Sequence, residues 1–140
     1  MSVNPFVGSW TYRSLLNDPN PATDFEKLEF GLGTLTITDA GPDQLGGSIG
    51  GDGWGPLALR GSMNPGNPRQ ARFQGKGLDN GELWIYDYIC WLVPVWPNST
   101  DTLQTAALVG SVVRTIPHSG GDGTVHPAGV VASFYCVRQS

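Results

Sequence analysis

The sequence predicts an all-β protein, namely a single eight-stranded antiparallel up-and-down β-barrel. Composition is the first reason, because 20 glycines and 11 prolines in 140 residues, with only 14% charged residues, are typical of short strands joined by tight turns. Length is the second reason, since two domains would each bury too little apolar surface, so residues 1–140 are expected to form one domain. The third reason is an alternation of apolar and polar residues along the candidate strands.

The strand candidates lie between clusters of Gly, Pro, Asn and Asp. They are Phe6–Leu15, Leu28–Thr38, Leu45–Gly50, Leu57–Met63, Ala71–Gly75, Glu82–Val93, Leu103–Ile116 and Gly129–Arg138. Most connections are too short for crossover helices, so neighbouring strands should pair antiparallel. Closure of the sheet removes both exposed edges, and eight strands enclose packed side chains or one small ligand.

The long first connection contains the Pro-rich loop Asn17–Asp24. Thr23 and Glu26 are spaced as a capping box, which predicts a short helical turn before the second strand.

Alternation marks one inner and one outer face in the first five strands, but the last three strands are apolar on both faces. In Glu82–Val93, for example, one set is Leu83, Ile85, Ile89 and Trp91, and the other is Trp84, Tyr86, Tyr88, Cys90 and Leu92. The pattern does not decide which set points inward. An apolar outer face indicates homo-oligomerisation through strands six to eight, and the alternative is that a lid or a chain terminus covers it.

Charge and cysteine content limit the partners. A net charge of −4 without a Lys/Arg run argues against nucleic acid and against an anionic membrane surface. No apolar stretch is long enough for a spanning helix and no signal-peptide pattern is seen, so we expect a cytoplasmic protein. Cys90 and Cys136 fall on strands two apart, beyond disulfide reach, and should be free thiols.

No metal or cofactor is predicted. The Gly-Gly-Asp-Gly copies at Gly50–Gly53 and Gly120–Gly123 are isolated, so they are interpreted as tight turns and not as calcium sites. The histidines and cysteines lack the spacing of zinc ligands, and no phosphate loop, nucleotide fingerprint or nucleophile elbow occurs.

The first strand carries Gly8-Ser9-Trp10, which resembles the Gly-x-Trp opening strand of the calycin superfamily. That resemblance implies that Trp10 closes the barrel floor and that Arg138, near the end of the last strand, packs against it. Avidins are nearer than lipocalins, because the chain is short, lacks a long C-terminal helix and has apolar late strands, which in avidins form the oligomer interface. The polar residues with which avidins bind biotin have no match here, so biotin binding is not implied.

Strand parity predicts which end of the barrel is open. The loops after odd-numbered strands, which share one end, are Leu16–Lys27, Gly51–Pro56, Lys76–Gly81 and Pro117–Ala128. They bring Phe25, Trp54, His118 and His126 to one rim, while the opposite end holds Trp10 and Arg138. The pocket should therefore open near His118.

The candidate ligand-binding residues are aromatic and polar side chains below this rim. They are Tyr12, Trp54, Trp84, Tyr86, Tyr88, Arg114 and His118, with Ser14 beside them. Arg114 could hold a carboxylate or enolate, and His118 could exchange protons near neutral pH. Alternatively, Arg114 pairs with Asp87 or Asp101 on the surface, His118 is a solvated turn residue, and the tyrosines are only strand formers.

Three functions fit these observations. The first is a barrel that binds one small, largely apolar molecule, which can be anionic. The second is a cofactor-independent enzyme, such as an isomerase, cyclase or lyase, that uses Arg114 as an anchor. The third is a structural module with a filled barrel. A cavity inside the barrel would distinguish the first two from the third.

Overall fold

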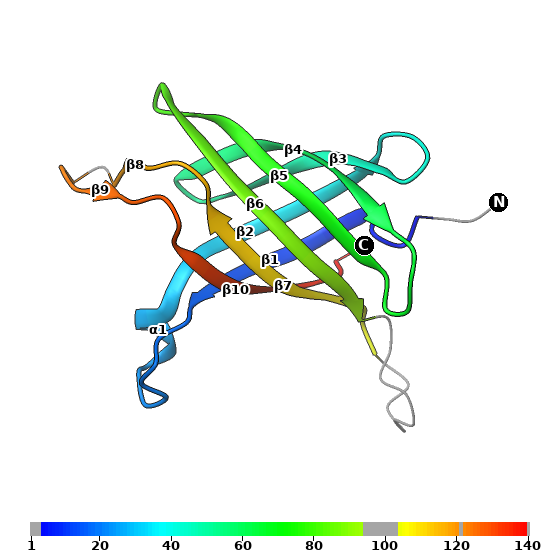
Figure 1. The fold of residues 1–140 in the computed structure, drawn as a ribbon, viewed down its shortest axis with the longest axis horizontal. Coiled ribbons are helices and arrows are strands. Elements are labelled where there is room, and N and C mark those ends of the chain that lie inside the picture. Colours follow the sequence, from blue (N-terminus) through cyan, green and yellow to red (C-terminus); the bar gives the residue numbers. More distant parts are fainter. Residues whose placement is uncertain (1–3, 94–103, 121, 140) are drawn as a thin grey trace.

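The computed structural model describes residues 4–93, 104–120 and 122–139. In this part of the chain, eight strands form a closed antiparallel barrel in the order β1-β10-β7-β6-β5-β4-β3-β2 (Figure 1). The barrel strands are β1 (Gly8–Leu16), β2 (Glu29–Asp39), β3 (Gln44–Gly51), β4 (Trp54–Asn64), β5 (Gln70–Asp79), β6 (Glu82–Val93), β7 (Ala107–Arg114) and β10 (Val131–Val137). The predicted fold class is thus confirmed.

Two hairpin turns are tighter than predicted. β5 and β6 are joined by Asn80-Gly81, where both residues have positive φ (51° and 79°), as a hairpin that matches the twist of its strands requires. β3 and β4 are joined by Asp52-Gly53, with Gly53 at φ +83°. The predicted loops at these positions therefore belong largely to the strands.

The predicted short helical turn before the second strand is present, but the capping box is not formed. Helix α1 (Phe25–Leu28) has Asp24 at its N-cap position, and no side chain caps it. The Thr23 hydroxyl instead donates to Asp18 Oδ2 at 3.2 Å, within the loop. Local polar contacts in the loop have outcompeted the cap.

The connection from β7 to β10 contains a small hairpin that the sequence did not indicate. It consists of β8 (His118–Ser119) and β9 (Val125–His126). Figure 1 shows this hairpin, α1 and the β5–β6 turn at one end of the barrel, and both termini at the other. The loops after odd-numbered barrel strands thus share one end, as strand parity predicted.

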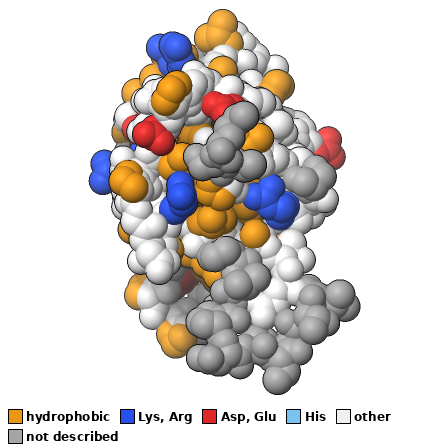
Figure 2. Space-filling model, turned by 90° about the vertical axis from the view of Figure 1, so that its right-hand side faces the viewer, with side chains coloured by type: hydrophobic (Ala, Val, Ile, Leu, Met, Phe, Trp, Pro, Cys, Tyr) orange, Lys and Arg blue, Asp and Glu red, His pale blue; other side chains and the backbone are white. Residues whose placement is uncertain are grey.

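The end that holds the termini is closed by a tryptophan and an arginine. Trp10 is fully buried, and the guanidinium carbon of Arg138 lies 4.3 Å from the Trp10 ring centroid. Arg138 also donates to the Val7 carbonyl at 3.0 Å and to the Pro5 carbonyl, which ties the N-terminal segment to the last strand. Figure 2 shows this end of the molecule, where hydrophobic side chains gather near the centre with Lys and Arg side chains beside them. The predicted packing of Arg138 on Trp10 is confirmed.

Closure of the barrel determines which side chains of β6 point inward. Tyr86, Tyr88, Cys90 and Leu92 are buried, whereas Leu83 and Trp91 are exposed. Cys90 and Cys136 are both buried and free. No helix among the described residues is long and apolar enough to cross a membrane.

The outer apolar face is the outward surface of β6, β7 and β10. Its most exposed members are Leu83 at 39%, Trp91 at 37%, Val109 at 40%, Val131 at 47% and Tyr135 at 39%. Trp91 lies opposite Val109, and Val109 lies opposite Tyr135, so these side chains form one row across three neighbouring strands. No described segment covers that row.

Candidate functional site

A pocket of about 430 Å³ opens at the end of the barrel that carries the β8–β9 hairpin. Every candidate ligand-binding residue predicted from the sequence lines it, namely Tyr12, Trp54, Trp84, Tyr86, Tyr88, Arg114 and His118, together with Ser14 and His126. Phe25 does not line the pocket and is 68% exposed. Lining residues that the sequence did not single out are Phe30, Gly31, Gly53, Asp79, Asn80, Glu82, Ser119 and Gly120.

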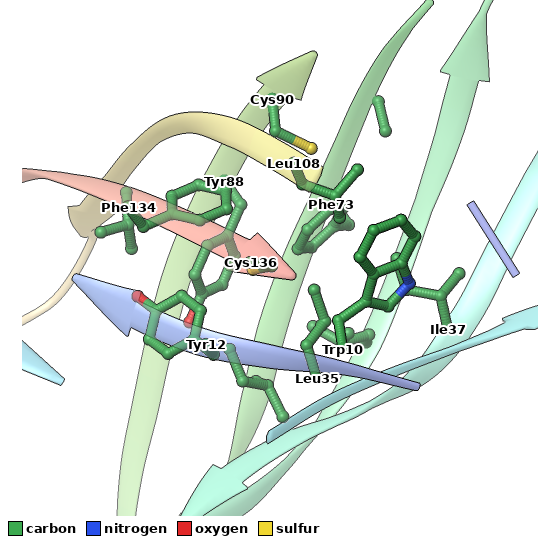
Figure 3. Close-up of a cluster of buried hydrophobic side chains, with 14 of the residues drawn as sticks. Trp10, Tyr12, Leu35, Ile37, Phe73, Tyr88, Cys90, Leu108, Phe134 and Cys136 are labelled. Carbon is green, nitrogen blue, oxygen red and sulfur yellow. The ribbon is translucent and has the colours of Figure 1, made fainter. Parts of the chain in front are cut away.

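Aromatic side chains form the floor of the pocket. The Tyr88 ring stacks on Phe73 at 5.1 Å between centroids, and Tyr12 packs against Phe134 at 5.5 Å and edge-on to Tyr88 at 6.1 Å. Figure 3 shows the Tyr12 and Tyr88 hydroxyls on the side of this cluster that lies away from Trp10. Below this layer the barrel is filled with apolar side chains, so the pocket occupies only the open end.

The floor hydroxyls are neutral. Burial raises the pKa of Tyr12 and that of Tyr88 above the ordinary value of 10.0. Each therefore presents a phenol, which can donate and accept a hydrogen bond, and not a phenolate.

The walls include Phe30 and Trp54, two aromatic residues that lie beside irregularities in the strand pairing. The β1–β2 pairing shifts register next to Phe30, between the pairs Ser14–Gly31 and Leu15–Glu29. The β3–β4 pairing likewise shifts between Ile49 and Gly51, next to Trp54. A bulge re-aims the side chain beside it, so strict alternation does not predict that Phe30 points inward.

Because Gly31 has no side chain, the part of the pocket beside these aromatic rings stays open. A Cβ atom at this position would lie 3.1 Å from Ser14 Oγ, 3.4 Å from Tyr12 Cε2 and 4.0 Å from Trp54 Cζ2, all in residues that line the pocket. A larger side chain here would occupy the pocket.

A chain of three polar side chains forms one wall. Arg114, at the end of β7, lies opposite Tyr86 of β6, so their side chains meet on the inner face. Arg114 Nε donates to the Tyr86 hydroxyl at 3.0 Å, and that hydroxyl lies 2.6 Å from His118 Nε2. On its other side, His118 Nδ1 lies 3.0 Å from the Ser119 carbonyl oxygen.

The direction of these hydrogen bonds follows from their partners. A carbonyl oxygen only accepts, so His118 Nδ1 carries the proton and donates to Ser119. In neutral His118 the Nε2 atom is then the acceptor, and Tyr86 donates to it while accepting from Arg114. The chain runs in one direction from Arg114 through Tyr86 to His118.

His118 is buried against an aromatic side chain. It is only 3% exposed, and its ring stacks on Trp84 at 3.8 Å between centroids. Burial lowers the pKa of His118, chiefly opposed by its hydrogen bond with Ser119, and the positive charge of Arg114 lowers it further. The alternative that His118 is a solvated turn residue was wrong, because the β8–β9 hairpin holds it against β6.

Two opposed effects act on the pKa of the Tyr86 hydroxyl. Burial raises the pKa of its hydroxyl, and the hydrogen bond and charge of Arg114 pull that pKa back down. The net direction is upward, so Tyr86 is a phenol whose developing negative charge Arg114 would stabilise.

Arg114 does not pair with Asp87. Arg114 is 7% exposed and donates through Nη1 to the Pro127 carbonyl at 3.2 Å. Asp87 instead accepts from Gln74 at 3.0 Å and from the Thr115 hydroxyl. Asp101, the other partner considered, lies outside the described residues.

Two acidic side chains lie at the rim of the pocket and accept hydrogen bonds from backbone amides there. Asp79 accepts from the Gly55 amide at 2.8 Å, and Glu82 accepts from the Ser119 amide at 2.7 Å, which pins β8 to β6. In the described part of the chain no group of three or more His, Cys, Asp and Glu side chains could hold a metal ion.

The arrangement can enclose a flat apolar molecule between aromatic rings and meet one polar group with Arg114, Tyr86 and His118. Comparison of the chain with protein-family models, with curated proteins and with solved structures gives no match.

Proposed function

We propose that this protein is a binding barrel that takes one small, largely apolar molecule into the open end. The proposal rests on the pocket of about 430 Å³, which is walled by aromatic rings and opens at one end of the barrel. Ligand pockets are typically concave and mostly apolar, with a few polar groups that orient the ligand. A barrel with a filled interior is not favoured, because the open end is hollow.

A calycin-like, more avidin-like, relationship is part of the same proposal. It is supported by the closed barrel order, by Trp10 of the Gly8-Ser9-Trp10 segment and by Arg138 on the Trp10 ring. The free, buried Cys90 and Cys136 are in keeping with a reducing compartment such as the cytoplasm.

Native mass spectrometry of protein isolated from its source, followed by a metabolite-extract screen, tests this function. We expect one retained small molecule per chain and a raised melting temperature with that molecule. The matched variant is Gly31→Leu, whose side chain would enter the pocket from β2 and should prevent retention of the molecule. Retention of nothing, with no stabilisation by any extract, would refute a binding function.

A second candidate is a cofactor-independent proton-transfer enzyme, and the chain of hydrogen bonds from Arg114 to His118 favours it. Tyr86 could pass its proton to neutral His118 Nε2 while it takes one from the bound molecule, and Arg114 would stabilise the charge that develops. Return of the proton to another atom of the same molecule would complete an isomerisation that needs no further reactant.

Turnover of the molecule identified in the first experiment tests this candidate. We expect Arg114→Met to abolish turnover and Tyr86→Phe to abolish it while ligand binding persists. Unchanged rates in both variants would remove the polar wall from any reaction and leave binding as the function.

A further inference from the structure

We infer that the natural ligand carries a single acidic group, a carboxylate or an enolate, and that Arg114 is the residue that holds it. This inference rests on the proposed binding function and adds the chemical class of the ligand. The observation behind it is a buried cation that the described protein does not neutralise.

Arg114 is 93% buried, since only 7% of its surface is exposed, yet it forms no ion pair with a described Asp or Glu side chain. Its hydrogen-bond acceptors are the Tyr86 hydroxyl and the Pro127 carbonyl, both neutral. A buried charge is costly unless it is paired, and arginine is seldom buried alone. The protein thus keeps a cationic group desolvated beside a pocket.

Part of the guanidinium remains unused. Of its five N–H donors, those on Nε and Nη1 supply the two hydrogen bonds, and Nη2 has no hydrogen-bond partner among the described residues. The Phe30 ring lies 4.9 Å and the Tyr86 ring 5.8 Å from the guanidinium carbon. These rings orient the cation and stabilise it in part, but they carry no net negative charge.

The surrounding charges leave the anion position to the ligand. Glu82 precedes Tyr86 by four residues on β6, which places it about 13 Å along the strand toward the rim. Its carboxylate and that of Asp79 accept backbone amides at the mouth. His118 contributes no negative charge, since its ring is neutral or cationic. Neither carboxylate forms an ion pair with Arg114, so the anion position beside the guanidinium is left to the ligand.

The geometry also limits the body of the ligand. A planar carboxylate or enolate matches the planar donor edge of a guanidinium. Once the acid is on Arg114, the remainder lies beside the rings of Trp84 and Trp54, above the floor formed by Tyr12 and Tyr88. The ligand class is thus a flat, apolar monoacid that fits within about 430 Å³.

A matched probe pair tests the inference with the whole chain. The probes are 2-naphthoate and its neutral isostere 2-naphthamide, and binding is followed by calorimetry and by Trp fluorescence. We expect naphthoate to bind about 10- to 100-fold more tightly than naphthamide, the ratio that a hydrogen-bonded charge provides. Arg114→Met should remove this ratio, because it lowers the affinity for naphthoate far more than the affinity for naphthamide. Arg72→Met, at an exposed position of β5, is the matched control.

The outcomes separate this inference from the proposed function. Equal affinities of the wild-type protein for the two probes overturn the acid inference and leave a binding pocket in place. An intact ratio in Arg114→Met overturns the role of Arg114. Failure of both probes to bind overturns the inference, and the retained-ligand experiment then decides the binding function separately. If Arg114→Met does not fold, Arg114→Lys replaces it and should reduce the ratio because it lacks the planar donor edge.

Discussion

At the scale of single residues, the Tyr86 hydroxyl joins a buried cation to a buried imidazole. Tyr86→Phe removes the acceptor of Arg114 Nε and the donor to His118 Nε2 without changing the shape of the core. Leaving these buried groups unpaired should reduce the free energy of unfolding by about 1–3 kcal/mol. Urea denaturation measures the loss.

A tyrosine-to-phenylalanine substitution at Tyr135, on the outer side of the sheet, provides the control. Tyr135 lies on the outer apolar face and is 39% exposed. Tyr135→Phe should change the free energy of unfolding by less than about 0.5 kcal/mol. Equal losses in the two variants would mean that the hydrogen bonds of Tyr86 contribute nothing specific.

His118 should make stability depend on pH. Its pKa is lowered in the folded protein from the ordinary 6.5, so below that pH the unfolded chain binds a proton that the folded chain refuses. The free energy of unfolding should therefore fall as pH drops from about 7.5 through 6.5, until the folded-state pKa is reached. Urea denaturation at a series of pH values measures this slope.

His118→Gln should flatten that slope, because glutamine does not titrate and its side-chain oxygen can still accept from Tyr86. His126→Gln is the matched control. His126 lies 5.4 Å from the His118 ring centroid but has no hydrogen bond to Tyr86. A slope that survives His118→Gln and disappears in His126→Gln would contradict the assignment.

At the scale of elements, sequence reasoning succeeded where one physical signal dominates. The bounds of Glu82–Val93 were predicted to the residue, because turn residues flank a long apolar run. Its inner face could not be chosen, since Trp, Tyr and Leu occupy both parities and only barrel closure distinguishes them. Phe30 was missed because a bulge reverses local parity, and the β8–β9 hairpin was missed because its segment is polar and rich in glycine.

The closing contact between the first and last strands should contribute measurably to stability. Arg138→Met removes the hydrogen bonds to the Val7 and Pro5 carbonyls and the cation over Trp10. We expect the free energy of unfolding to fall by about 2 kcal/mol, with ligand affinity unchanged because the pocket lies at the other end. Chemical denaturation and probe binding measure the two quantities.

An exposed arginine controls for the loss of charge alone. Arg60 lies on the outward side of β4, and Arg60→Met should leave stability within about 0.5 kcal/mol of the wild type. A similar small effect in Arg138→Met would contradict a closing role for Arg138.

At the scale of the whole molecule, the two ends of the barrel differ in composition. The closed end is packed with apolar side chains and capped by Arg138, whereas the open end keeps polar groups and a cavity. The residues that line the pocket are therefore confined to one end of the sheet. A variant at the closed end, such as Arg138→Met, should change the free energy of unfolding without changing ligand affinity.

The barrel also differs from side to side, because the outer apolar face covers only β6, β7 and β10. The row Trp91, Val109 and Tyr135 crosses β6, β7 and β10, and large exposed apolar patches on proteins typically mark interfaces. We expect a homo-oligomer built on this face, since a self-complementary patch readily joins two copies of one chain. Size-exclusion chromatography with light scattering should show more than one chain per particle at micromolar concentration.

A charge placed in the middle of that row tests the interface directly. Trp91→Glu should give a monomer, because assembly would bury a carboxylate without a partner. Thr36→Glu, at an exposed position on the outward side of β2, adds the same charge elsewhere and should leave the assembly intact. Because Trp91 points away from the pocket, the Trp91→Glu monomer should keep its affinity for the naphthoate probe. A monomeric wild-type protein, or an assembly that persists in Trp91→Glu, would show that this face does not join copies of the chain.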